Sequence, residues 1–98
     1  MPGLNKIIHE RARLLILTYL ASNQKKEISF NETLENLQFS SGNLSVQLRN
    51  LQGAGYIAIH KAFKENKPYT TLSITHQGSD ALNRYVAEME EIIKTLKK

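Results

Sequence analysis

An apolar stripe that ends at two glycines is the feature that most constrains how this chain can fold. Its three leucines recur at intervals of four and three residues, the spacing of one helical face; they are Leu44, Leu48 and Leu51. Ser40 precedes the stripe as a favourable N-cap, and Gly53 and Gly55 favour the end of a helix and a change of chain direction. The pattern predicts a helix over residues 40–53 that rests on a core through its leucines.

A β-hairpin is predicted directly after this helix. Residues 56–62 and 69–74 are rich in β-branched and aromatic side chains, and a lysine-rich turn over residues 64–68 separates them. We therefore expect a hairpin over residues 56–74.

Capping residues predict three further helices, over about residues 5–22, 30–38 and 76–97. Asn5 and Thr75 are N-caps for the first and the last, and Ser29 with Glu32 has the capping-box spacing for the middle one. A chain of 98 residues, 41% of them apolar, allows one domain over residues 1–98. The expected fold class is mainly α with a small β-hairpin, an α+β arrangement.

The first and last predicted helices carry more apolar surface than one small core can cover. The first helix has two apolar faces, and the last has a seam that steps by three and four residues. A last helix of about 30 Å, at its rise per residue, would project beyond so small a core. We predict that these helices form a homodimer; the alternative is that the seam folds back onto the first helix of the same chain. The predicted interface residues are Leu4, Ile8, Leu15, Tyr19, Leu82, Tyr85, Met89, Ile92 and Leu96.

The solvent face of the helix over residues 40–53 indicates an anionic partner. Small, amide and guanidinium side chains replace the usual glutamate and lysine mixture there, and no acidic residue occurs between Gln38 and Lys64. The formal net charge of the chain is +4, a moderate excess that decides nothing alone. These features favour duplex DNA, with Arg49 suited to guanine and Asn43 to adenine. Lysines of the hairpin would contact phosphates.

Several segments together resemble the winged helix-turn-helix transcriptional regulators of the MarR and ArsR type, over nearly the whole chain. The segments are Ile8-His-Glu-Arg-Ala-Arg-Leu-Leu-Ile-Leu17, Ser41-Gly-Asn-Leu-Ser-Val-Gln-Leu-Arg-Asn-Leu51, Gly55-Tyr-Ile57 and Leu72-Ser-Ile-Thr-His-Gln-Gly78. The resemblance implies a recognition helix, a β-wing, a C-terminal dimerisation helix and a homodimer that acts as a repressor. Two positions depart from the family pattern, because Val46 and Tyr69 stand where relatives often carry basic residues.

The residues and the resemblance together predict two groups of DNA contacts. The recognition-helix group is Ser41, Asn43, Ser45, Val46, Gln47, Arg49 and Asn50. The wing group is Lys61, Lys64, Lys67, Tyr69 and Thr70. The rival hypothesis is a winged-helix module that binds another protein through the same helix, since fold alone does not fix function.

Other functional classes find little support in the sequence. The chain has no cysteine, its three histidines lack metal-ligand spacing, and no nucleophile or phosphate-loop motif is present. We therefore expect no enzymatic activity, no metal and no cofactor, and leave a small-molecule effector open. The absence of a signal pattern and of a long apolar run predicts a soluble, cytoplasmic protein.

Overall fold

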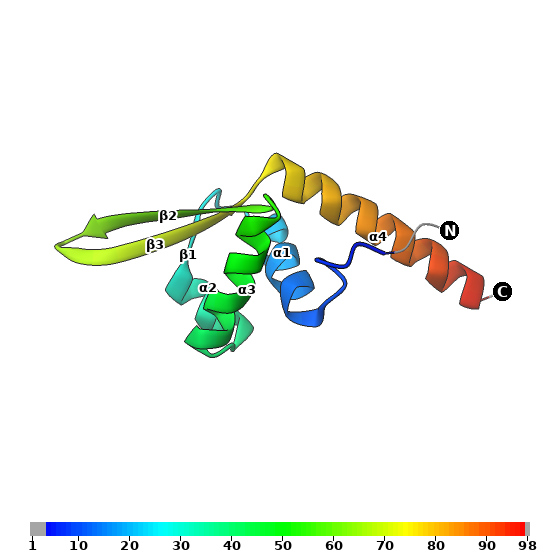
Figure 1. Ribbon diagram of the computed structural model, residues 1–98, viewed down its shortest axis with the longest axis horizontal. Coiled ribbons are helices and arrows are strands. Elements are labelled where there is room, and N and C mark those ends of the chain that lie inside the picture. Colours follow the sequence, from blue (N-terminus) through cyan, green and yellow to red (C-terminus); the bar gives the residue numbers. More distant parts are fainter. Residues whose placement is uncertain (1–3, 98) are drawn as a thin grey trace.

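Four helices and three strands make up the computed structural model, which describes residues 4–97 (Figure 1). In chain order they are α1 (Arg11–Ser22), β1 (Ile28–Ser29), α2 (Phe30–Leu37), α3 (Ser41–Gly53), β2 (Ile57–Lys64), β3 (Lys67–Ile74) and α4 (His76–Leu96). This arrangement is a winged helix, as the sequence predicts. No helix in the described range is both long enough and apolar enough to cross a membrane.

The sheet is antiparallel, with strand order β1-β3-β2. β2 and β3 pair from Ile57 opposite Ile74 to Lys64 opposite Lys67, which leaves only Glu65 and Asn66 in the turn. Both turn residues have positive φ, 54° and 64°, as a tight two-residue hairpin turn requires. This hairpin, which we call the wing, extends to one side of the helices, and α4 extends to the other (Figure 1). The molecule is accordingly elongated, at 57 × 25 × 24 Å.

One core joins the helices to the base of the wing. The buried leucines of α3 pack with side chains from α1, β1, β2, β3 and α4. Gly78 fixes the start of α4 on this core, because a Cβ at that position would lie 2.1 Å from the backbone oxygen of Tyr56. The same oxygen accepts a hydrogen bond of 3.0 Å from the backbone N–H of Thr75. The direction in which α4 leaves the core is therefore set at its first turn.

The first helix begins at Arg11, and the prediction that it begins near Asn5 is wrong. Asn5 caps a short turn instead, since its Oδ1 accepts hydrogen bonds from the backbone N–H groups of Ile7 and Ile8. Glu10 then has an extended backbone and serves as the N-cap of α1. The segment over residues 4–10 consequently lies outside the helix.

The predicted dimer seam is wrong for three of its residues. Ile8, Leu82 and Tyr85 are buried in the core of a single chain, so they cannot meet a second copy. Met89 also packs partly against this core. The first half of α4 therefore folds back onto its own chain, as the alternative hypothesis holds, because a residue step of three to four brings Leu82 and Tyr85 over α1.

Candidate nucleic-acid interface

The third helix presents one face to the core and the opposite face to solvent. Ser40 begins the helix, because its Oγ accepts a hydrogen bond of 3.2 Å from the backbone N–H of Asn43. Leu44, Leu48 and Leu51 are buried, whereas Val46 on the opposite side is 48% exposed. Nothing lies within 4 Å of a Cβ built on Gly42 or Gly53, so the solvent face is open along its length.

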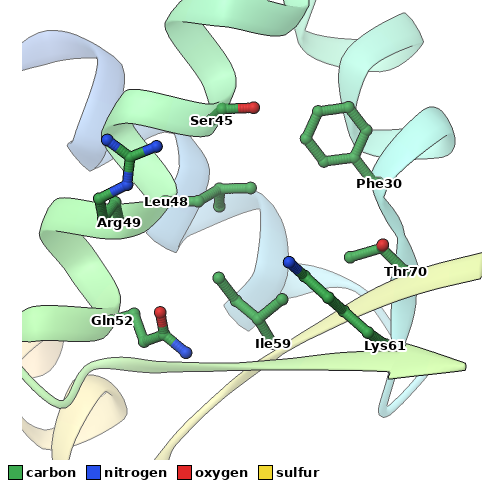
Figure 2. Close-up of a pocket in the computed structure, with 8 residues that line it drawn as sticks. All are labelled: Phe30, Ser45, Leu48, Arg49, Gln52, Ile59, Lys61 and Thr70. Atoms are coloured by element: carbon green, nitrogen blue, oxygen red, sulfur yellow. The ribbon is translucent and has the colours of Figure 1, made fainter.

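One flank of α3 lies along a groove that separates it from the wing (Figure 2). The groove has a volume of about 670 Å³, and its lining residues are Phe30, Ser45, Leu48, Arg49, Gln52, Ile59, Lys61 and Thr70. Arg49 on the helix and Lys61 on β2 both line it, and no acidic residue is among the lining residues that the structure describes. This flank therefore has a positive potential, and a groove focuses such a potential on an approaching anion.

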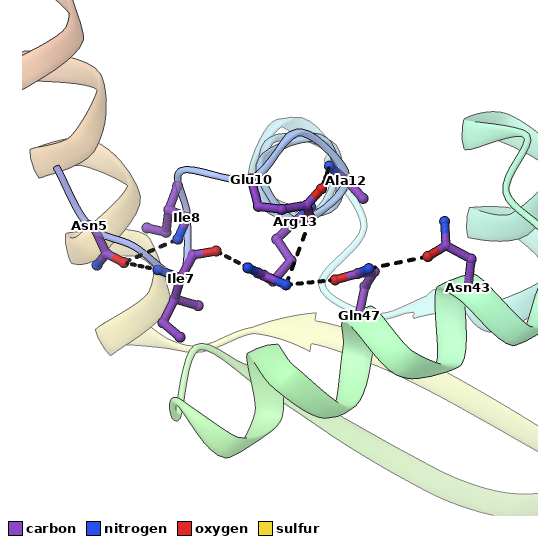
Figure 3. Close-up of polar contacts among 8 residues, drawn as sticks. All are labelled: Asn5, Ile7, Ile8, Glu10, Ala12, Arg13, Asn43 and Gln47. Carbon is purple, nitrogen blue, oxygen red and sulfur yellow. Dashed lines mark hydrogen bonds and ion pairs between the residues drawn. The ribbon is translucent and has the colours of Figure 1, made fainter.

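The other flank of α3 is tied to the beginning of α1 by a chain of side-chain hydrogen bonds (Figure 3). Nη1 of Arg13 donates to Oε1 of Gln47 at 2.9 Å, and Nε2 of Gln47 donates to Oδ1 of Asn43 at 3.2 Å. Nε of Arg13 donates to the backbone oxygen of Ile7 at 2.6 Å. Arg13 is thus held at two points and cannot reorient without breaking both bonds.

Glu10 caps α1, and its carboxylate lies beside the guanidinium group of Arg13 (Figure 3). Its carboxylate accepts from the backbone N–H groups of Ala12 at 3.0 Å and Arg13 at 3.2 Å, and it lies 3.8 Å from Nη1 of Arg13. The hydrogen bond from Ala12 is the main cause that lowers the pKa of the Glu10 carboxyl; the N–H of Arg13 and the charges of Arg13 and Arg11 add to it, against partial burial, which raises it. The cap is therefore charged at neutral pH.

The wing lysines do not form a single surface. Successive side chains of a strand point to opposite faces, so Lys61 shares the helix-facing side with Ile57 and Ile59, and Phe63 continues that side toward the tip. Phe63 is 78% exposed. Lys64 lies on the opposite face, where its Nζ is 5.0 Å from the centre of the Tyr69 ring in a cation–π contact.

The predicted wing group is therefore divided between two faces. Lys61 and Thr70 line the groove beside α3, whereas the cross-strand pairing places Lys64, Lys67 and Tyr69 on the other face. The sequence could not show this division, because it depends on where the two-residue turn sets the register of the hairpin.

The predicted recognition-helix residues all lie on α3, but on three different parts of its surface. The solvent face carries Ser41, Asn43, Val46 and Asn50; the groove flank carries Ser45 and Arg49; Gln47 lies on the flank beside α1. Sequence reasoning missed Gln52 on the groove flank, although it is three residues after Arg49 and so on the same side of the helix. It also missed Arg13, for which the sequence offers no comparable signal. No group of three or more metal-binding side chains occurs among residues 4–97.

Comparisons with known proteins agree with this geometry. Residues 12–93 match the family model described as a winged helix DNA-binding domain. An uncharacterized protein of Methanocaldococcus jannaschii is 29% identical over 91 residues, which cover 93% of this chain and 97% of that protein.

Two solved structures show the same fold. A transcriptional regulator homologue of Pyrococcus horikoshii has a TM-score of 0.85 at 24% identity, covering 94% of this chain and 89% of that one. MepR of Staphylococcus aureus, solved in complex with DNA, has a TM-score of 0.71 at 21% identity, covering 87% of this chain and 61% of MepR. The match of the family model over most of the sequence shows that this chain belongs to the family of winged helix DNA-binding domains.

Proposed function

We propose that this protein is a transcriptional regulator that binds duplex DNA sequence-specifically as a homodimer and represses the genes beside its sites. The observation that carries the proposal is the pairing of an open helix face with a cationic groove at its flank. A helix fits the major groove of DNA only where its outer side chains are small or can hydrogen-bond to base edges, and α3 meets that condition.

The two parts of the surface have different roles in this proposal. Asn43, Val46 and Asn50 would face base edges, since they occupy the solvent side of α3. Arg49 and Lys61 line the protein groove and would hold the DNA backbone. Arg49 could instead reach a guanine at the edge of the DNA major groove. Phosphate contacts supply affinity and position, whereas base contacts supply sequence preference.

The distal half of α4 supports the homodimer. Val86, Ile93 and Leu96 are 42%, 45% and 79% exposed, and they form an apolar stripe along the part of the helix that projects from the core (Figure 1). Ile92, which the sequence assigns to the interface, is half-buried beside them. A second copy of the same stripe would cover these side chains through a two-fold interface. Such a dimer presents two copies of α3, and therefore prefers inverted repeats.

Repression would follow from where the protein binds on the DNA. A dimer that occupies a site overlapping a promoter excludes RNA polymerase, and nothing in the fold would be needed beyond DNA binding. MepR is described as a transcription regulator of a multidrug efflux pump; its shared fold is compatible with this role for the present chain.

Selection from a pool of random duplexes, followed by affinity measurements over a range of salt, tests the proposal. We expect an inverted repeat to emerge, with log affinity falling by about 0.9 per phosphate contact for each unit of log salt concentration. A promoter that carries the selected repeat should lose transcription in a purified system when the protein is added. Failure to enrich any sequence, with no salt-dependent duplex binding, would instead favour the rival protein-binding module.

A further inference from the structure

We propose that Arg13, which would not itself contact DNA, determines the base preference of α3 by fixing which edge Asn43 presents to DNA. The inference rests on the proposed function, because it concerns how the same helix reads its site. Its content is specific: Asn43 presents hydrogen-bond donors outward and therefore selects guanine rather than adenine.

The orientation of both amides follows from the chemistry of the arginine. A guanidinium group has donors and no acceptor, so the Gln47 atom at 2.9 Å from Nη1 of Arg13 must be the amide oxygen. The amino group of Gln47 then faces Asn43, and the Asn43 atom at 3.2 Å must in turn be an oxygen. The amino group of Asn43 is left on the exposed side of the helix (Figure 3).

This orientation holds because the arginine is itself immobilised. Its side chain is only 17% exposed. The backbone oxygen of Ile7 accepts from Nε of the guanidinium group, and the carboxylate of Glu10 lies 3.8 Å from Nη1, the same nitrogen that donates to Gln47. A flip of the Gln47 amide would bring its amino group against Nη1 of Arg13, donor against donor. Unless Asn43 flipped as well, the flip would also place the Gln47 oxygen against the Asn43 oxygen, acceptor against acceptor. The two amides are therefore constrained as a pair.

The fixed amides change the expected base. An asparagine that pairs with adenine accepts from N6 through its oxygen and donates to N7 through its amino group. In this structure the Asn43 oxygen is turned toward Gln47, from which it accepts a hydrogen bond. The group that Asn43 turns outward is therefore its amino group, which carries two N–H donors. Guanine presents two acceptors in the major groove, N7 and O6, and is the matching base.

The test compares the base preferences of two variants that each lose one positive charge. Arg13→Met removes the donors of Arg13. Arg11→Met is the matched control, because Arg11 is exposed, lies two residues earlier on α1 and takes no part in the hydrogen bonds that join Ile7, Arg13, Gln47 and Asn43. Asn43→Ala identifies the base pair in question as the one whose preference disappears. At that position we expect the unaltered protein and Arg11→Met to select guanine, and Arg13→Met to lower the guanine-to-adenine affinity ratio about tenfold.

A second variant tests the same idea without touching Arg13. Asn43→Asp can still accept from Gln47, but it has no donor to turn outward, so we expect guanine to be replaced by cytosine, whose N4 amino group is a donor. The change should not impair folding, because an acidic side chain is favourable in the first turn of a helix. Thermal unfolding of each variant checks that the fold is retained.

The outcomes separate this inference from the proposed function. If the unaltered protein enriches a sequence but prefers adenine at that position, the inference is overturned and sequence-specific binding stands. The same holds if Arg13→Met keeps the guanine preference, if Asn43→Asp keeps it, or if Asn43→Ala changes no position. If no sequence is enriched at all, the proposed function fails, and the inference with it.

Discussion

A single substitution on α4 should separate the dimer into monomers without unfolding the chain. Ile93 is 45% exposed, so a change there costs the isolated chain little core packing. We choose Ile93→Glu, because a carboxylate must lose its hydration when a second copy covers it. Thr95→Glu is the matched control: it adds the same charge two residues later, about 200° around the helix, where the side chain is exposed.

The expected magnitude follows from the exposed area. Two copies of Ile93 together expose roughly one complete isoleucine side chain, whose burial contributes about 1.5 to 3 kcal/mol. Losing that contribution raises the dimer dissociation constant by roughly tenfold to a hundredfold. The cost of removing the two carboxylates from water adds to this loss, so the estimate is a lower bound. Val86 and Leu96 remain and would hold only a weaker dimer.

Sedimentation equilibrium over a range of protein concentrations measures this directly. The unaltered chain and Thr95→Glu should sediment at twice the monomer mass, and Ile93→Glu should sediment at the monomer mass until much higher concentration. On DNA, Ile93→Glu should bind a full inverted repeat little better than a half-site. The reasoning is refuted if the unaltered chain is a monomer at the concentrations that saturate its DNA site, or if Ile93→Glu dissociates no more than its control.

Two further predictions concern charge. Lys61→Ala should weaken binding to all duplexes alike, because an ammonium at a phosphate senses charge and not sequence, and it should reduce the slope of log affinity against log salt concentration by about 0.9 per subunit. The control Lys97→Ala, at the far end of α4, should leave this slope unchanged. An equal slope for both variants would place Lys61 away from phosphate. Glu10→Gln should lower the free energy of unfolding at neutral pH by about 0.3 to 1 kcal/mol, because the amide keeps one acceptor but loses the negative charge at the N-terminus of α1. Because the pKa of Glu10 in the folded chain is below its ordinary value of 4.5, the charged cap stabilises the fold above that value and the stabilisation is lost as the pH falls through the lowered pKa. Chemical denaturation of both chains at several pH values should therefore show the difference shrinking in acid, and a constant difference would contradict the assignment.

The parts of the fold that the sequence predicts well are those that local signals specify. α3 rests on its leucines, and Ser40 begins it, because a cap and a helical stripe act within a few residues of each other. The hairpin follows from β-branched runs on either side of a short turn. The division of the wing lysines between two faces does not follow, since moving the turn by one residue would exchange the faces.

The α4 seam shows what periodicity alone cannot decide. The steps of three and four are present, but two neighbouring stripes share them, one through Leu82 and Tyr85 and another through Val86 and Ile93. Which stripe meets the core depends on how α4 crosses α1, and that angle is fixed by the close contact of Gly78 with Tyr56. The seam predicted from the sequence mixes the two stripes: Leu82 and Tyr85 pack inside the chain, whereas Leu96 is exposed. It omits Val86 and Ile93.

The wrong start of the first helix and the missed role of Arg13 have the same cause. In a helix that began at Asn5, the backbone oxygen of Ile7 would accept from the N–H of Arg11, four residues later. That oxygen would then be directed along the helix axis, away from any side chain. Because the helix begins only after Glu10, the oxygen of Ile7 is free to accept from Nε of Arg13 at 2.6 Å, and the other end of the guanidinium reaches Gln47. Glutamate is an uncommon N-cap, so the local signal favoured Asn5. The placement of a side chain beside the recognition helix therefore depends on a helix boundary that propensity alone would set six residues too early.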